Sequence, residues 1–478
     1  ALALLAAGAL RPALAGLCRQ LGVDAAPGHW RWLALMAVLA LATRYGGKIY
    51  PDSMPGDIGF HVNRFADVAR GTLLIVSRNR GVDFPYPPAL YLLLAPLTLA
   101  GLERRVALQL GAALLDALSP LLVYVIAVGA LTSPSPLSRA WERGGHRWAL
   151  VAAAIYTFSA AGYMTTWWNF STHIFAQFVH LLLVAALVAL WPALTDRGPG
   201  TGKKGTGEKK SRWTSTALTL PRLGPRPSGM RSPIGLRSPI HSPRSTVVVL
   251  VLLQLLVYLG HFGFWMNMSL LGALGLAALL WGAWRGGVAW GVFRRLLAAF
   301  VVAQVLAALL FYTGYAGMLL AQAQAAASGG LTGLAGRAPV SRAMLWTILW
   351  DYGLRTHFGF FPLPLALCGG LLLATGTGRR GGVHEPRALV LGLMAATLAI
   401  ALFFAALPFL SGSTLSSRWL MFSAWAVAVG AALGARRLWR AGRAGRAVVT
   451  AAGAYVLWGT LSMWLGALAW RVRPPEPF

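Results

Sequence analysis

Long apolar stretches separated by short polar segments recur along the whole chain. Many of them run for about 17–25 residues, the length that an α-helix needs to cross a bilayer. The stretches are continuous rather than alternating, which excludes a transmembrane β-barrel. The pattern therefore predicts an all-α polytopic membrane protein.

The apolar runs define the candidate spans and most of the organisation of the chain. Hydrophobic residues make up 57% of the sequence, and the mean hydropathy is +0.62. No soluble domain of this length has that balance. Tryptophans such as Trp30, Trp168 and Trp265 fall near the ends of the runs, as an interfacial aromatic belt would. The candidate spans are 30–45, 87–101, 106–131, 148–166, 172–194, 246–266, 268–284, 296–320, 361–377, 388–410, 419–435 and 447–470.

The positions of the basic residues indicate how the chain is oriented in the membrane. The net charge of +29 invites a nucleic-acid partner, but Arg and Lys lie mainly in short loops between apolar runs, where orientation signals belong. We therefore expect no nucleic-acid partner and assign the basic loops to the cytoplasm. These loops are 139–147, 285–295, 379–380 and 436–446. The polar patches 165–173, 260–269 and 322–357, with the loop 411–418, then face the opposite side.

Composition divides the chain further. Segment 195–245 is basic and rich in Gly, Pro, Ser and Thr, so we expect a disordered linker between membrane halves at 30–194 and 246–478. Residues 1–29 form an N-terminal segment, and since the chain starts at Ala1 rather than Met we expect it to be truncated. Cys18 and Cys368 are far apart in apolar surroundings and indicate neither a disulfide framework nor a metal site.

Simple alternation of spans leaves one conflict in the topology. If 132–147 is cytoplasmic, two crossings at 87–101 and 106–131 place the loop 46–86 on the cytoplasmic side as well. Segment 87–101 is short and opens on two prolines. Either this segment enters the membrane without crossing it, or one of the spans is wrong.

The loop 46–86 holds an unusual share of the negative charge. Asp52, Asp57, Asp67 and Asp83 are four of only thirteen acidic residues in the chain. Asp57 and His61 are four residues apart, so on a helix they share a face. A carboxylate there suits a general base or a metal ligand, with His61 orienting it. The equally weighted alternative is that Asp57 caps the N-terminus of a helix.

The same loop carries further candidates for substrate binding. Asp83 and Tyr86 precede Pro87 and Pro88, whose fixed φ angles would place them rigidly at the mouth of the next helix. Taken alone, this motif favours a plain loop-to-helix junction. Asn63 and Arg64, between the two motifs, are also candidates for substrate binding.

Three later patches bring aromatic, imidazole and charged groups to the same predicted side. His173 and His261 stand beside tryptophans and asparagines, a combination that suits sugar faces and hydroxyls, although tryptophans alone also anchor helices at the interface. Asp351, Arg355 and His357 follow Trp350 and form either a solvated ion pair or a substrate contact.

The remaining charged positions are sorted by their surroundings. Arg418 precedes an apolar run at the membrane edge, and the bidentate fork of Arg is suited to phosphate. Asp116 lies in mid-span and is expected to pair within the helix bundle. His180 is expected to be a hydrogen-bonded bundle residue rather than a ligand. Walker A, CxxC and HExxH motifs are absent from the sequence.

The order of these motifs resembles a known family. An apolar helix is followed by Gly56-Asp57-x-x-x-His61, by a stretch ending Arg70-Gly71, and by Tyr86-Pro-Pro-x-x-Tyr91 at the next helix. In the order of these motifs the chain resembles the GT-C superfamily of integral-membrane glycosyltransferases. The resemblance is best over 30–165. It implies a bundle of roughly 11–13 transmembrane helices of spanning length, with a long first extracytoplasmic loop.

The resemblance also implies an activity. The site would lie on the extracytoplasmic face of the cell membrane, within the cell envelope. The donor would be a polyprenyl-phosphate sugar and the acceptor a lipid, glycan or protein. Asp57 would act as the base, position the acceptor or hold a metal. The family often has a paired acidic motif where this chain has His61, so a divalent metal is compatible but not required.

Other functional classes stay open from the sequence. A multi-helix transporter or lipid flippase would place polar residues along the depth of the bundle, whereas a transferase would gather them at one mouth. An O-antigen ligase or polymerase-like enzyme would use Arg and His in a large late loop, for which 321–360 is a candidate.

Overall fold

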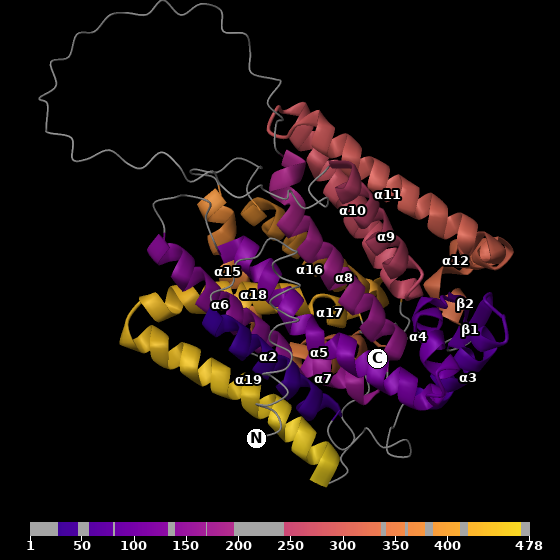
Figure 1. Cartoon of the computed structure of the whole chain (residues 1–478), viewed down its shortest axis with the longest axis horizontal. Coiled ribbons are helices and arrows are strands. Elements are labelled where there is room, and N and C mark those ends of the chain that lie inside the picture. Colours follow the sequence, from indigo (N-terminus) through magenta and orange to yellow (C-terminus); the bar gives the residue numbers. More distant parts are fainter. Residues whose placement is uncertain are drawn as a thin grey trace, which may run out of the picture.

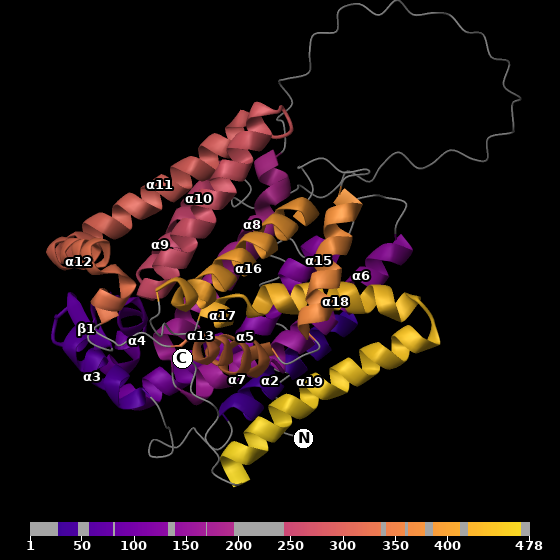
Figure 2. The same ribbon diagram turned by 180° about the vertical axis from the view of Figure 1, so that it is seen from behind.

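The structure is a computed structural model that describes residues 27–45, 57–79, 82–131, 139–168, 170–195, 243–335, 341–358, 362–377, 386–411 and 419–469. Within these residues the chain is helical apart from short connections and one two-stranded antiparallel hairpin (Figures 1 and 2).

The elements of the first part are α2 (Pro27–Tyr45), α3 (Ile58–Ala69), β1 (Ile75–Asn79), β2 (Val82–Tyr86), α4 (Ala89–Leu99), α5 (Arg104–Leu131), α6 (Arg139–Thr157), α7 (Ala160–Trp167) and α8 (Ser171–Thr195). Those of the second part are α9 (Pro243–Tyr258), α10 (Phe262–Trp284), α11 (Trp290–Leu310), η3 (Tyr312–Tyr315), α12 (Ala316–Ala335), α13 (Arg342–Thr347), η4 (Ile348–Arg355), α14 (Thr356–Phe358), α15 (Pro362–Thr377), α16 (Pro386–Ser411), α17 (Trp419–Phe422), α18 (Ala424–Arg440) and α19 (Arg443–Ala469).

The helices confirm the predicted fold class. Within the described residues, seven helices are long and apolar enough to cross a bilayer, and three shorter apolar helices accompany them. α2 and α18, which are not among these seven, also contribute buried residues to the core. The chain is therefore an all-α polytopic membrane protein. The predicted linker at 195–245 lies almost wholly outside the described residues, and the division into two membrane halves stays a prediction.

Three helix boundaries differ from the sequence prediction, each for a local reason. The span predicted at 148–166 breaks at Phe158, where the Ser159 hydroxyl accepts a hydrogen bond from the Gly162 amide and caps α7. His261 caps α10 through its Nδ1, so the break falls at 259–261 rather than at 267. The span predicted at 296–320 ends at Leu310 and turns through η3 into α12.

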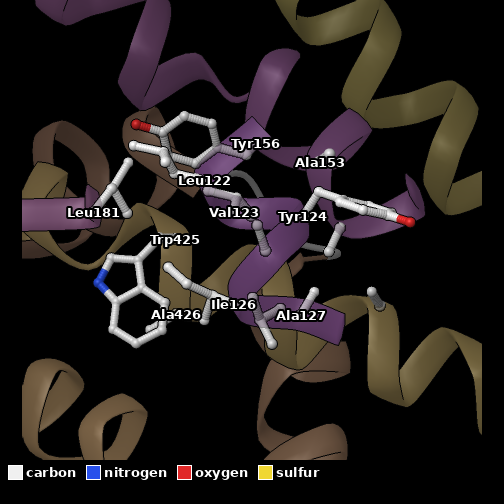
Figure 3. Close-up of a cluster of buried hydrophobic side chains, with 14 of the residues drawn as sticks. Leu122, Val123, Tyr124, Ile126, Ala127, Ala153, Tyr156, Leu181, Trp425 and Ala426 are labelled. Carbon is white, nitrogen blue, oxygen red and sulfur yellow. The ribbon is translucent and has the colours of Figure 1, made fainter. Parts of the chain in front are cut away.

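The core lies where α5, α6, α8 and α18 meet. Figure 3 shows Tyr124, Tyr156 and Trp425 among smaller aliphatic side chains from these helices, and all three aromatic residues are buried. α15 and α18 cross so closely that a side chain at Gly369, Gly430 or Gly434 would collide with the backbone of the other helix. Small residues at such a crossing are typical of helix packing in membranes.

The direction of the helices settles the conflict in the topology. The start of α2 lies beside the end of α5, where the Tyr124 hydroxyl is 3.4 Å from His29 Nδ1. The end of α2 lies beside the middle of α5, where Arg44 contacts Asp116. The two helices are therefore antiparallel, and the segment between them begins and ends at one end of the bundle. α4 has 11 residues and spans about 16 Å, too short for a hydrocarbon core of about 30 Å.

The two ends of the bundle differ in chemistry. The polar end is where α2 ends and α8 begins, and it includes α3, the hairpin and the start of α10. The arginine end is where α5 ends, and there Arg436 donates a hydrogen bond to the Leu131 carbonyl oxygen at 3.3 Å. Arg285, Arg295 and Arg387 lie at the same end, since α10 ends and α11 and α16 begin there. The structure thus gathers basic loops at one end.

A buried ion pair joins α2 to α5. Arg44 Nη1 lies 2.6 Å from Asp116 Oδ1, and the two side chains are 1% and 9% exposed. Arg44 Nη2 also donates to the carbonyl oxygens of Tyr156 and Thr157 at 3.0 and 2.8 Å. A side chain at Gly162 would collide with the guanidinium, so the glycine makes room for it. The prediction that Asp116 pairs within the bundle is confirmed.

The expectation for His180 is only partly met. His180 is a buried bundle residue, packed against the rings of Phe264, Phe422 and Trp425. Neither of its ring nitrogens has a hydrogen-bond partner in the part of the chain that the structure describes, so the prediction of a hydrogen-bonded histidine was wrong. The aromatic rings exclude polar neighbours from this position.

Replacing Asp116 by Ala is expected to lower the free energy of unfolding by about 3–5 kcal/mol, because the Arg44 charge is left buried without its partner. Unfolding in detergent by heat or denaturant measures the change. Asp67→Ala is the matched control, since Asp67 pairs with Arg64 and Arg70 at the surface of α3 and such pairs contribute about 0–1 kcal/mol. Equal losses in the two variants would contradict the importance of the buried pair.

Candidate functional site

Asp57 lies at the start of α3, at the polar end. The buried residues of α3 are Ile58, His61, Phe65 and Val68, a helical spacing that faces one side of α3 inward. The Asp57 amide donates a hydrogen bond to the Trp168 carbonyl oxygen at 3.1 Å, which ties α3 to the junction of α7 and α8. Asp57 is half-buried. Asp57 occupies the N-cap position of α3, as the capping alternative expected, but its carboxylate makes no capping hydrogen bond to the amides of α3.

His61 is buried in a cluster of tyrosines. Its Nδ1 lies 2.8 Å from the Tyr91 hydroxyl and 3.4 Å from the Tyr86 hydroxyl. The Tyr86 hydroxyl in turn lies 2.9 Å from Thr172 Oγ1, and His61 is only 2% exposed. Four elements, α3, β2, α4 and α8, therefore meet in one polar cluster. His61 lies one helical turn from Asp57, with its imidazole held by the tyrosines.

The β1–β2 hairpin is held by η3 and α12. The Tyr315 hydroxyl donates to the Ile75 carbonyl oxygen at 2.8 Å, and the Gln322 amide donates to the Asp83 carbonyl oxygen. Burial raises the pKa of Tyr315 to about 12, so its hydroxyl stays protonated as a donor near neutral pH. The Asp83 carboxylate pairs with Arg78 across the hairpin at 3.2 Å and is 43% exposed.

His173 and His261 are brought together from distant parts of the sequence. Their ring centroids are 5.5 Å apart, with the rings nearly perpendicular, and both rings lie against Phe264. His173 is buried in the first turn of α8, whereas His261 is half-buried at the start of α10. The two histidines therefore adjoin the Tyr86 and Thr172 contact at the same end of the bundle.

The other candidates in the first loop face outward. Asn63 is exposed on α3. Arg64 lies 3.0 Å from Asp67 and 5.2 Å from the centroid of the Phe60 ring, so its guanidinium is held along the surface of α3. Asn63 is therefore accessible from the polar end, whereas Arg64 is half-buried beside Phe60, whose ring packs against Tyr86.

A second group of predicted residues lines a separate cavity. A space of about 410 Å³ lies between α7, α18, α19 and the segment η4–α14, and Asp351, Arg355 and His357 are among its lining residues. Arg355 Nη1 lies 3.3 Å from Asp351 Oδ1, and the two side chains are 57% and 43% exposed. His357 is fully buried, with its Nδ1 2.7 Å from the Gly353 carbonyl oxygen.

Asp57 and His61 do not line this cavity. The helix α7 separates the two groups: Ser159 and Ala160 at its start line the cavity, whereas Trp168 at its end contacts Asp57. α7 has eight residues, a length of about 12 Å. Arg418 and Asp52 lie outside the described residues.

The structure adds residues that the sequence analysis did not select. Tyr91 and Thr172 complete the cluster around His61, and both stood beside candidates within the motifs already noted. Gln322 on α12, which donates to the hairpin, was only the first residue of a polar patch, and Thr460, whose hydroxyl donates to the Phe158 carbonyl oxygen, had no local signal. Their roles come from contacts between segments that are hundreds of residues apart.

The described residues contain no cluster of three or more His, Cys, Asp or Glu side chains that would hold a metal ion. Asp57 and His61 share a helix face, but the imidazole of His61 is engaged by tyrosines. We therefore derive no step through a metal.

Comparison with known proteins gives a fold rather than a family. No family model and no curated protein matches the chain. The oligosaccharyltransferase of Archaeoglobus fulgidus, in a complex with Zn and sulfate, matches with 13% identity and a TM-score of 0.50 over 94% of this chain. The chain shares its fold with that oligosaccharyltransferase. The present chain spans about half of the length of that oligosaccharyltransferase, 54% of which is covered. The predicted all-α bundle thus agrees with the fold of a solved oligosaccharyltransferase.

Two further solved structures are similar at lower scores. The same oligosaccharyltransferase tethered to an acceptor peptide matches with 14% identity and a TM-score of 0.48, covering 92% of this chain and 54% of that one. ArnT from Cupriavidus metallidurans, bound to undecaprenyl phosphate, matches with 14% identity and a TM-score of 0.45, covering 94% of this chain and 72% of that one.

The contact between Tyr86 and Thr172 can be tested by a double-mutant cycle. Tyr86→Phe and Thr172→Val are each expected to lower the free energy of unfolding by about 0.5–1.5 kcal/mol, since each removes one side of a buried hydrogen bond. The double variant should lose less than the sum of the two, which thermal unfolding measures. Strict additivity would show that the two side chains do not interact.

Proposed function

We propose that this protein is a membrane glycosyltransferase that moves a sugar from a polyprenyl-phosphate donor to a lipid, glycan or protein acceptor. The observation that carries the proposal is the placement of Asp57. It is a half-buried carboxylate at the N-cap position of α3 that makes no hydrogen bond to the amides of that helix. Its backbone amide holds it against the α7–α8 junction, in a fold shared with an oligosaccharyltransferase.

Asp57 acts as the general base. It takes the proton from the acceptor hydroxyl or amide as that group attacks the anomeric carbon. The bond between this carbon and the phosphate oxygen breaks, and the polyprenyl phosphate leaves with the electron pair. A single displacement of this kind inverts the configuration at the anomeric carbon. His61 is buried among tyrosines and acts by positioning α3, and therefore Asp57, rather than by touching the substrate.

The donor phosphate is held by arginine. Arg355 is more than half exposed in the wall of the cavity, and its 3.3 Å contact with Asp351 is long enough to be exchanged for a phosphate oxygen. Arg418 is the second candidate, on the segment before α17. His357, behind Arg355, positions the end of η4 through its contact with the Gly353 carbonyl oxygen.

The sugar and acceptor lie between the two groups, along α7. Tyr86, His173 and His261 offer aromatic and imidazole groups on one side of Asp57. Asn63, Arg64 and Asp83 are accessible on the surface nearby and are proposed as contacts for the acceptor (Asn63 being exposed and the other two half-buried). The length of α7 requires a substrate that extends over about 12 Å or a rearrangement of the polar end.

The reaction takes place on the extracytoplasmic face. The loops at the arginine end carry the excess of positive charge, and such loops face the cytoplasm. Asp57, Asp83 and Asp351 lie near the other end of the bundle. A transferase is expected to have its polar residues at one end of the bundle, whereas a transporter is expected to have them along the depth of the bundle. The lipid bilayer and a polyprenyl-linked donor are the partners that follow.

Asp57→Asn is expected to lower the rate of sugar transfer by about 10²–10⁴-fold, because the base is removed and the shape is kept. Membranes that contain the protein are supplied with a panel of radiolabelled polyprenyl-phosphate sugars, and transfer to endogenous lipid, glycan and protein is counted. Asp67→Asn is the control, because Asp67 lies on the surface of α3 and pairs with Arg64 and Arg70. This variant should transfer sugar at the rate of the parent chain. An Asp57→Asn protein that folds and retains full activity excludes Asp57 as the base.

Arg355→Gln is expected to raise the KM for the donor by about tenfold with a smaller change in kcat, since one charge-assisted hydrogen bond to phosphate is lost. Steady-state transfer with the donor identified in the panel measures both constants. An unchanged KM would assign phosphate binding to another residue, with Arg418→Gln as the next variant.

A further inference from the structure

An apolar groove lies on the opposite flank of the bundle from the cavity beside α7. Its volume is about 300 Å³, and its walls come from α8, α9, α10, α11 and α16. The lining is almost entirely aliphatic and aromatic, with Gln254 and Tyr258 as its polar members. The charged residues proposed to act in sugar transfer do not line it.

The groove opens onto the bilayer. Only 22% of the residues in the most apolar stretches of α10 and α11 are buried, so these helices face lipid over most of their surface. Figures 1 and 2 show α10 and α11 at the edge of the bundle, far from α19. An apolar cavity excludes water, because water finds no hydrogen-bond partner in it. In a membrane, hydrocarbon is therefore the medium that fills the groove.

The groove has positive charge at one end. Leu296 and Ala388 line its wall near the arginine end, and each directly follows an arginine in the sequence. Arg295 Nη1 donates to the Leu194 carbonyl oxygen at 3.5 Å, which places the guanidinium at the end of α8. Arg387 is half-buried, and its buried Nε has no hydrogen-bond partner among the described residues.

Among the described residues, no charged side chain lines the groove itself, and the two arginines lie only beside lining residues at one end. The other end of the groove closes near Tyr258 and Gln254, at the polar end, where the Tyr258 carbonyl oxygen accepts a hydrogen bond from Tyr312. On α10 the lining runs from Met268 to Leu279, a length of about 16 Å. This is close to one leaflet, since the whole hydrocarbon core measures about 30 Å.

We propose that this groove binds an acyl chain of an anionic glycerophospholipid from the leaflet at the arginine end. The lipid phosphate lies against Arg295 and Arg387, where arginine offers charge-assisted hydrogen bonds to its oxygens. The acyl chain runs along α10 between α8 and α16. The bound lipid joins α10 and α11, which have few buried residues, to the core helices.

The test is a thermal unfolding series on the purified full chain in detergent. Dioleoylphosphatidylglycerol should raise Tm in a saturable manner, and dioleoylphosphatidylcholine at the same concentration should not, because only the former carries a net negative charge. Arg295→Gln and Arg387→Gln should each raise the half-saturating lipid concentration by about tenfold, because each variant loses one charge-assisted hydrogen bond to the phosphate. Arg443→Gln on α19 is the control arginine and should respond as the parent chain does.

A second pair of variants tests the groove itself. Gly275 lines the groove, and a Cβ added there meets no atom within 4 Å, so we expect the longer side chain of Gly275→Leu to extend into the groove. Gly453→Leu on α19 is the matched control, since a Cβ there also meets no atom within 4 Å. Gly275→Leu should keep the lipid-free Tm and lose the response to phosphatidylglycerol.

Two outcomes would overturn the proposal. Equal responses to both lipids, or a response that survives in Gly275→Leu, would show that the stabilisation arises elsewhere. Polyprenyl phosphate that displaces phosphatidylglycerol from the groove would assign the site to the donor chain instead. Neither outcome bears on Asp57, whose role is tested by transfer.

Discussion

The buried pair of Arg44 and Asp116 is the constraint on which the polar end depends. An arginine in the interior of a membrane protein is tolerated only if its charge and its hydrogen bonds are satisfied. Asp116 supplies the charge from α5. Arg44 Nη2 also donates to the carbonyl oxygens of Tyr156 and Thr157, which lie in the last turn of α6, beyond which the helix does not continue. The interruption of the helix and the ion pair are thus one device that joins α2, α5 and α6.

This device also places the residues proposed to react. After the interruption the chain continues as α7, whose start lines the cavity with Arg355 and whose end carries the Trp168 carbonyl oxygen that receives the Asp57 amide. The tyrosine cluster around His61 fixes α3 from the other side. Asp57 therefore stands on a scaffold held at two points, which suits a base that must be positioned within a fraction of an ångström. Arg355, proposed to bind the donor phosphate, has an exposed side chain that pairs with Asp351 in the cavity wall.

The two ends of the bundle are built for different surroundings. The polar end gathers aromatic rings, histidines and most of the described carboxylates around short helices and a hairpin. The arginine end carries positive charge with few carboxylates in the described residues, and the apolar groove between α8, α10 and α16 leads toward it. Since α10 and α11 bury few of their residues, lipid is a structural neighbour of these helices rather than a mere solvent.

The site illustrates how far motifs alone can lead. His173 and His261 were selected from separate patches, and the structure brings their rings to 5.5 Å. Asp57 and Arg355 were also selected, but α7 lies between them and they do not share a cavity. Tyr91 and Thr172 became recognisable only as neighbours of His61. A motif records which chemical groups are present, whereas their separation depends on how distant helices cross.

The sequence by itself determined the polytopic helical class, the orientation signal of the basic loops and the pairing of Asp116 within the bundle. Hydrophobic length and charge placement express these features locally, because a bilayer imposes the same thickness and polarity on every segment. Only the tertiary structure decided that α4 stops short of crossing, that α6 breaks before α7 and that His61 faces tyrosines. Each of these depends on a partner from a remote segment, such as Arg44 for the last carbonyl oxygens of α6, and no local pattern identifies that partner.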